Sequence, residues 1–249
     1  MDSVEFHPCL QHPFNLICSA ASQGGKTFWV RKLLLEKKIE PWPERIVWVY
    51  CYASSVCPSL KHKMPHIEYF DHIPHNIMDE DFTDPSKPTL IILDDQMQNL
   101  NEDVMSLFTR GTHHLNRSVI LTVQNVFYQS VFMRTISLNA HYLVLWKQPR
   151  DMAQIAALGN QMYPQKSKQF LDAYKKATIA PYGYLFIDLR PTTDDRLRLR
   201  TAVLGEMEDS FQRVFLIENN KLEVKVLKPV MSFSKNLKSK SCSDCDPID

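Results

Sequence analysis

The sequence predicts an α/β protein whose largely parallel central sheet is flanked by helices on both faces. Apolar runs such as LIIL at 90–93 and SVILTV at 118–123 lack polar alternation, which is typical of strands buried on both faces. These runs alternate with segments of helical spacing. The first strand also leads through a bend of small residues, 20–25, directly into the first helix, an arrangement that favours phosphate binding.

The strands and helices follow one another in a regular order along the chain. We expect strands near 15–18, 46–52, 67–70, 89–93, 118–123, 141–146, 184–188 and 196–203. We expect helices near 26–39, 102–113, 152–162 and 166–178. Pro41 and Pro43 should end the first helix, and a polar loop at 84–88 directly precedes the most apolar strand.

The character of the sequence changes after about Gly205. We therefore expect an α/β domain over 1–205 and a C-terminal extension over 206–249. The extension would begin with a β-hairpin that turns at Asn219 and Asn220, and it would end in a mobile tail rich in Lys and Ser. The tail contains Cys242 and Cys245 in a CxxC arrangement, whose role the sequence leaves open.

Composition limits the possible functions. The chain of 249 residues has a formal net charge of +1, so any contact with nucleic acid must come from local basic patches. No apolar run approaches the roughly 20 residues of a transmembrane helix, and the N-terminus does not resemble a signal peptide, so we expect no membrane span and no secretion. The six cysteines lack framework spacing, which favours reduced thiols.

The bend after the first strand matches the Walker A pattern in spacing, except that Ala20 replaces the first glycine. We expect it to bind the phosphates of ATP through Ala20, Ala21, Ser22, Gln23, Gly24, Gly25, Lys26 and Thr27. Lys26 would reach the β- and γ-phosphates, and Thr27 would ligate Mg²⁺. The domain 1–205 is thus predicted to be a P-loop NTPase of the RecA/ASCE-like type. Alanine at position 20 matters only if that residue needs a positive φ or unusually close packing.

An acidic pair follows the apolar strand 89–93 and supplies a Walker B partner for the loop. Asp94 would hold Mg²⁺ together with Thr27, and Asp95 lies where hydrolytic enzymes place the carboxylate that orients the attacking water. Many such enzymes have Glu at this place, and Asp is one methylene shorter. If the next strand is a neighbour, Gln124 and Asn125 lie beside the pair, where an amide can hold the water or merely cap a turn.

Five segments together resemble a known family. They are NLICSAASQGGKT, TLIILDDQM, LFTRGTHHLNRSVILTVQNVF, RTISLNAHYLVLWKQPRD and RLRLRT. In order and spacing they are similar to the genome-packaging ATPases of Polinton/Maverick elements, adintoviruses and related large DNA viruses, poxviruses included. That group belongs to the FtsK–HerA division of P-loop ATPases. The resemblance spans about 13–201, and TRGTHH and RTISLNAHY are its most discriminating parts.

The resemblance implies a homo-oligomeric ring that uses ATP hydrolysis to thread double-stranded DNA into a capsid, where portal or vertex proteins would be its partners. It also implies work in a host cell nucleus or a cytoplasmic virus factory. By position, Lys26 and Thr27 form the Walker A pair, Asp94 and Asp95 the Walker B pair, and Gln124 the sensor.

Ring ATPases also use an arginine from the neighbouring subunit to stabilise charge in the transition state. Arg110, inside the TRGTHH segment, is the first candidate for this arginine finger. Arg134 and Arg150 are alternatives, and Arg117 is a weaker one.

Two other functions stay open at this point. A small-molecule P-loop kinase shares the loop and the Mg²⁺ chemistry, although the stretch 161–177 contains no arginine for the mobile lid of such kinases. A non-hydrolytic nucleotide-binding module, derived from an element of this kind, is the other alternative. The departures at Ala20 and Asp95 favour it, whereas the intact motifs speak against it.

Overall fold

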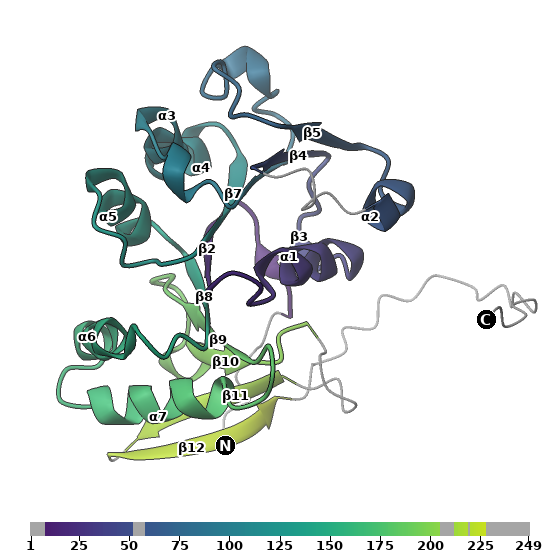
Figure 1. The fold of residues 1–249 in the computed structure, drawn as a ribbon. Helices are drawn as coiled ribbons and strands as arrows, with labels where there is room; N and C mark the ends of the chain where they lie inside the picture. Colours follow the sequence, from purple (N-terminus) through teal and green to yellow (C-terminus); the bar gives the residue numbers. More distant parts are fainter. Residues whose placement is uncertain (1–7, 52–57, 205–211, 219, 228–249) are drawn as a thin grey trace, which may run out of the picture.

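The computed structural model describes residues 8–51, 58–204, 212–218 and 220–227. Its main feature is a ten-stranded sheet with the order β12-β11-β10-β9-β8-β2-β7-β6-β4-β5 (Figure 1). The strands are β2 (Asn15–Ser19), β4 (Arg45–Tyr50), β5 (Ile67–Phe70), β6 (Thr89–Asp94), β7 (Arg117–Val123), β8 (Tyr142–Trp146), β9 (Tyr184–Asp188), β10 (Leu199–Thr201), β11 (Gln212–Glu218) and β12 (Lys221–Leu227).

The sheet has a parallel half and an antiparallel half. From β8 through β2, β7, β6 and β4 to β5, all neighbours are parallel, with Ile17 opposite Leu121 on one side and Leu143 on the other. From β8 to β12 all neighbours are antiparallel. The predicted α/β class with its parallel core is confirmed, and β2 lies inside that core between β8 and β7. The carboxyl ends of β2, β6, β7 and β8 therefore meet at one edge, where α/β proteins bind ligands.

Helices cover both faces of the sheet (Figure 1). One face carries α1 (Lys26–Leu35) and α2 (Pro58–Lys63), whose buried residues share a core with Trp48 and Phe186. The other face carries α3 (Glu102–Ser106), α4 (Thr112–His114), α5 (Val131–Leu138), α6 (Met152–Met162) and α7 (Ser167–Ala177). Phe108 and Phe170, both fully buried, belong to the second core. The two apolar cores explain why the parallel strands are apolar on consecutive residues.

Several elements differ from the prediction. Helix α1 ends at Leu35 rather than at 39, because Lys37 adopts a positive φ of 50° and Ile39–Glu40 forms strand β3, which pairs with β1 (Leu10–Gln11). The predicted strand 196–203 is shorter, since Asp195–Leu197 forms a 3-10 turn before β10. Helix α5 was not predicted. Its N-cap Ser130 accepts a hydrogen bond from the backbone N–H of Met133, and this cap was the signal in the sequence.

The helix predicted at 102–113 contains a π-helical turn. Its N-cap Asn101 accepts from the backbone N–H of Val104, as a capping side chain should. The turn Leu107–Gly111 then joins α3 to α4 and carries Arg110. π-Helical turns are rare in proteins overall, and those that occur are frequently found at functional sites.

A buried amide ties this turn to the central strand. Asn15, only 1% exposed, donates through Nδ2 to the carbonyl oxygens of Phe108 at 2.7 Å and Asn139 at 3.0 Å. Its Oδ1 accepts from the Thr112 hydroxyl at 2.6 Å. The TRGTHH and RTISLNAHY segments thus meet at the amino end of β2, opposite the end that leads into the phosphate loop.

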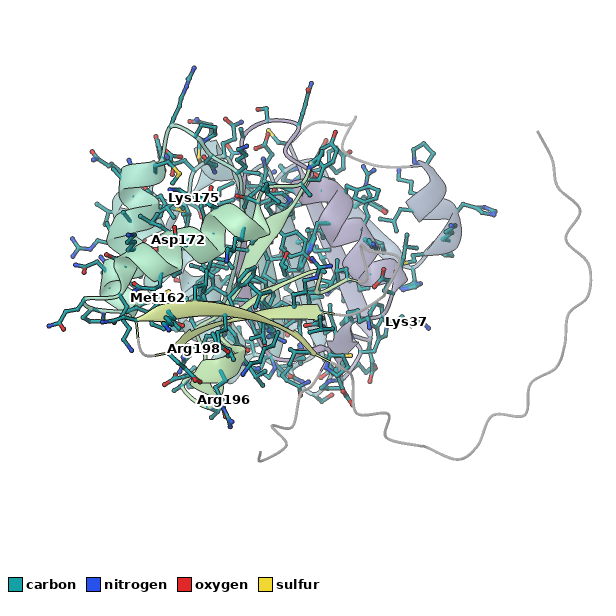
Figure 2. All side chains as sticks on the ribbon, turned by 90° about the horizontal axis from the view of Figure 1, so that it is seen from below. Lys37, Met162, Asp172, Lys175, Arg196 and Arg198 are labelled. Carbon is teal, nitrogen blue, oxygen red and sulfur yellow. The ribbon has the colours of Figure 1, made fainter. Side chains whose placement is uncertain are left out.

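The C-terminal hairpin extends the same sheet, since β11 pairs with β10 and β12 pairs with β11 from Gln212 opposite Leu227 to Glu218 opposite Lys221. Figure 2 looks at this end of the molecule, with α7 on one side of β12 and the 3-10 turn that carries Arg196 on the other. The predicted boundary at 205 and the predicted tail with Cys242 and Cys245 lie outside the described residues.

Candidate nucleotide-binding site

The loop between β2 and α1 needs both of its glycines. Gly25 is the N-cap of α1 and has a φ of 97°, a conformation that L side chains rarely adopt. A Cβ on Gly24 would lie 2.6 Å from the Ala20 Cβ and 2.9 Å from the Ala21 carbonyl oxygen. The loop is therefore as tightly wound as a backbone cradle for phosphates requires, and it opens at the N-terminus of a ten-residue helix.

Ala20 in place of glycine causes no strain. The residue is fully buried and does not belong to the residues with positive φ, which within the loop are Gln23 and Gly25. Its methyl group instead occupies the space that a side chain at Gly24 would need. The departure from the Walker A pattern is thus compatible with the geometry of the loop.

Lys26 is the first residue of α1, and its side chain folds back onto the loop. It is 8% exposed, and its Nζ donates to the carbonyl oxygens of Ala20 at 2.7 Å and Ala21 at 3.3 Å. Burial lowers the pKa of Lys26, while the charges of Asp95 and Asp94 raise it again. An ammonium in this position can neutralise the charge of a bound phosphate.

Asp94 and Thr27 form the candidate metal site. Asp94 is 1% exposed, and its Oδ1 accepts from the Thr27 hydroxyl at 3.0 Å and from the Thr122 hydroxyl at 2.8 Å. Burial raises the pKa of Asp94, and the hydrogen bonds from Thr122 and Thr27 oppose this shift. Carboxylate and hydroxyl oxygens are ligands that Mg²⁺ prefers, and a cation would stabilise the ionised carboxylate. The predicted pair therefore fits a magnesium ion.

Asp95 adopts a left-handed backbone conformation with a φ of 56°, and its N–H donates to the Thr122 hydroxyl at 2.8 Å. Asp and Asn tolerate this region better than other residues with side chains. The backbone thus favours Asp over Glu at this place. Thr122, which the sequence analysis did not select, contacts both acidic residues, and its only signal was a polar residue inside an apolar strand.

Amide side chains follow the acidic pair at the same edge. Strands β6 and β7 are neighbours, so Gln124 follows β7 at the same edge as the pair, and its side chain is exposed. Of the two roles predicted for an amide here, holding a water or capping a turn, Asn125 has the second. Its Oδ1 accepts a hydrogen bond from the backbone N–H of Phe127 at 2.7 Å. A second amide was missed. Gln148 Nε2 donates to the Ser19 hydroxyl at 3.1 Å and to the Gln124 carbonyl oxygen at 3.0 Å.

The four candidate arginines lie in different surroundings. Arg117 is fully buried and donates to the Thr83 hydroxyl and the carbonyl oxygens of Ile77 and Asp79, so it is a structural residue and its prediction as a possible finger was wrong. The other candidates, Arg110, Arg134 and Arg150, are exposed. Arg110 lies in the π-helical turn that contacts the amino end of β2, away from the phosphate loop of its own chain.

A cavity of about 480 Å³ opens over the phosphate loop. Its lining consists of Gln23, Gly24, Gly25, Lys26, Thr27, Phe28 and Tyr182. The two aromatic residues were not selected from the sequence. Phe28 follows the Walker A threonine directly and could have been found there, whereas Tyr182 comes from a distant loop and left no signal.

The strand order, the loop and the acidic pair define a P-loop NTPase fold. No protein-family model matches the chain, and no curated protein matches it. Among solved structures, the genome packaging NTPase B204 of Sulfolobus turreted icosahedral virus 2, in complex with ATP-gammaS, is similar at 12% identity, 76% coverage of this chain, 96% coverage of B204 and a TM-score of 0.46.

Two cellular proteins are similar to a comparable extent. The cytoplasmic domain of the type VII secretion ATPase EccC of Thermomonospora curvata shares 14% identity over 75% of this chain and 25% of that chain, with a TM-score of 0.46. The KaiC-like protein PH0186 of Pyrococcus horikoshii shares 11% identity over 86% of this chain and 90% of that chain, with a TM-score of 0.38. Such similarity concerns the fold alone.

In the part of the chain that the structure describes, no helix has the length and apolar character to span a membrane.

Proposed function

We propose that the protein is an ATP-driven motor that translocates the double-stranded DNA of a virus or element into a capsid. The observation that carries the ATPase part is the meeting of Lys26, Thr27, Asp94 and Asp95 at one edge of the sheet, with Thr27 3.0 Å from Asp94. The motor part rests on the resemblance of five segments to packaging ATPases of Polinton/Maverick elements, adintoviruses and poxviruses. A host nucleus or a virus factory is the proposed site of action.

Each residue has a proposed role in hydrolysis. Backbone N–H groups of the loop and the Lys26 ammonium bind the β- and γ-phosphates of ATP. A magnesium ion held by Thr27 and Asp94 would neutralise charge on the phosphate oxygens. Asp95 orients the attacking water toward the γ-phosphate, and Gln124 positions that water from the neighbouring strand.

Arg110 is proposed as the arginine finger that acts on the neighbouring subunit of a ring. Its turn lies at the opposite edge of the sheet from its own phosphate loop, so it can serve only a second copy of the chain. Its guanidinium is exposed, with one hydrogen bond to the Ser106 hydroxyl at 3.1 Å. An arginine finger accelerates hydrolysis by about 10³ to 10⁵.

The first experiment is ATP hydrolysis across a dilution series of the protein, with and without long duplex DNA. Lys26→Ala is the inactive reference, and Lys32→Ala is the matched control, because Lys32 lies in the same helix, forms an ion pair with Glu36 and does not line the cavity. A rate per subunit that rises with concentration and with DNA supports a ring motor. A rate per subunit that changes with neither protein concentration nor DNA contradicts the ring motor and favours the kinase or the non-hydrolytic module. An active Lys26→Ala protein refutes the site itself.

Mixing variants tests the shared active site. Lys26→Ala and Arg110→Ala should each be inactive alone, but a mixture should regain activity, because an intact Lys26 then meets an intact Arg110 across some interfaces. Arg134→Ala and Arg150→Ala, mixed in the same way, serve as controls. If Arg110→Ala is active and one of these variants is instead inactive alone but regains activity on mixing with Lys26→Ala, the finger is that arginine.

A further inference from the structure

We propose that Tyr182 and Phe28 bind the base of the nucleotide by stacking, at the end of the cavity away from the acidic pair. The proposal rests on the proposed function in one respect, namely that the loop of Lys26 binds a nucleoside triphosphate. It assigns the nucleoside part of the ligand, which the Walker residues leave open.

Both aromatic side chains are exposed beside the phosphate loop. Phe28 is 68% and Tyr182 73% exposed, although large aromatic residues are usually buried. Both line the 480 Å³ cavity together with the loop. A Cβ placed on Gly25 would lie 3.3 Å from Tyr182 Cδ1, so the ring lies directly against the loop backbone. A base in this cavity would cover apolar surface that otherwise faces water.

The backbone holds Tyr182 in place. Its φ of 59° is unusual for a bulky residue and costs on the order of 1 kcal/mol. The conformation is fixed by a hydrogen bond from Trp146 Nε1 to the Tyr182 carbonyl oxygen at 3.0 Å and by one from the Gly183 N–H to the Ala180 carbonyl oxygen at 3.0 Å. A Cβ on Gly183 would lie 2.6 Å from the Ala177 carbonyl oxygen, so the turn is closely packed. Strain of this kind is typical of binding sites.

Sheet topology gives the nucleotide a direction. Tyr182 precedes β9, and β9 and β8 lie on one side of β2, whereas β7 and β6 with the acidic pair lie on the other. The acidic pair therefore lies to one side of the loop and Tyr182 to the other, while Phe28 borders the same cavity from the first turn of α1. A triphosphate bound with its γ-phosphate near Asp94 and Asp95 directs its base toward Tyr182.

The test compares two ligands that differ in the nucleoside. Affinities of β,γ-methylene-ATP and of inorganic tripolyphosphate are measured by calorimetry with Mg²⁺ present. Tyr182→Ala and Phe28→Ala should each weaken binding of the ATP analogue by roughly 5- to 150-fold and leave binding of tripolyphosphate unchanged. Tyr182→Phe, which retains the ring, should bind both ligands as the unchanged protein does. Ile179→Ala is the matched control, since Ile179 is 81% exposed in the same loop but does not line this cavity.

The outcomes separate this proposal from the proposed function. Equal weakening of both ligands by Tyr182→Ala, or unchanged binding of the ATP analogue in both alanine variants, overturns the stacking role. Loss of subunit association without loss of affinity for the analogue overturns it as well, and assigns the rings to a protein interface. Lys26→Ala should weaken both ligands, and unchanged binding in that variant refutes the phosphate loop, independently of the two aromatic residues.

Discussion

Thr122 is the residue on which the acidic pair depends, and replacing it with valine tests this dependence. Valine has nearly the same shape but lacks the hydroxyl, which donates to Asp94 Oδ1 at 2.8 Å and accepts from the Asp95 N–H at 2.8 Å. A hydrogen bond to a charged group contributes about 1.5–3 kcal/mol, and an unpaired backbone N–H costs about 1–3 kcal/mol when buried. Since Asp95 is only half-buried, we expect Thr122→Val to lower the free energy of unfolding by about 2–4 kcal/mol.

Urea unfolding at neutral pH measures this loss, with Thr122→Ser as the control. Serine keeps the hydroxyl and loses one buried methyl group, which should cost about 1 kcal/mol. Similar slopes of the free energy against urea concentration would show that the change lies in stability itself. If valine is tolerated as well as serine, the Thr122 hydroxyl does not support the acidic pair.

Three further predictions follow from buried polar groups. Burial raises the pKa of Asp94, so the folded protein binds that proton more tightly than the unfolded chain does, and ionisation destabilises the fold as pH rises. Asp94→Asn should therefore stabilise the metal-free protein at pH 7 to 8, and unfolding experiments should show this advantage shrinking toward about pH 4; a constant difference would contradict the cause. Arg117→Met should lower the free energy of unfolding by about 3 kcal/mol or more, because three acceptors lose a charged donor, and nucleotide affinity of the folded fraction should not change. Asn15→Leu should cost about 2–4 kcal/mol and speed amide hydrogen exchange in 107–114, where a uniform change across the protein would speak against a local role.

The parallel core was the part of the fold that the sequence predicted best. Each of its strands is buried on both faces and therefore apolar over consecutive residues, which separates it clearly from the helices around it. Helix α5 escaped prediction because it is only eight residues long and leaves two of its apolar residues, Val131 and Leu138, exposed, so its apolar positions do not mark one face clearly. Strand β3 escaped because two residues that pair with a distant segment leave no pattern of their own.

The site was predictable where one short segment contains several of its residues. The loop 20–27 and the pair Asp94 and Asp95 are of this kind. Thr122, Gln148 and Tyr182 reach the site only through strand order and tertiary packing, which no local pattern records. Arg117 shows the opposite error: an arginine beside a motif suggested a catalytic role, whereas the fold buries it among carbonyl oxygens to join the segment 77–83 to β7.

The backbone conformation explains the two departures from the usual P-loop ATPase motifs, Ala20 and Asp95. Glycine at the start of the loop is needed where φ is positive or where no space is left for a Cβ, and Ala20 has no positive φ and keeps its methyl group in the space beside Gly24. A glutamate after Asp94 would reach further, but Asp95 has a φ of 56°, where Asp is better tolerated than Glu. Both residues therefore suit the local conformation, and neither indicates decay of the site. Tyr182 also has a positive φ, but tyrosine, unlike Asp or Asn, does not tolerate this conformation well. The conformation therefore costs free energy, and this strain is one reason to expect a ligand at the Tyr182 ring.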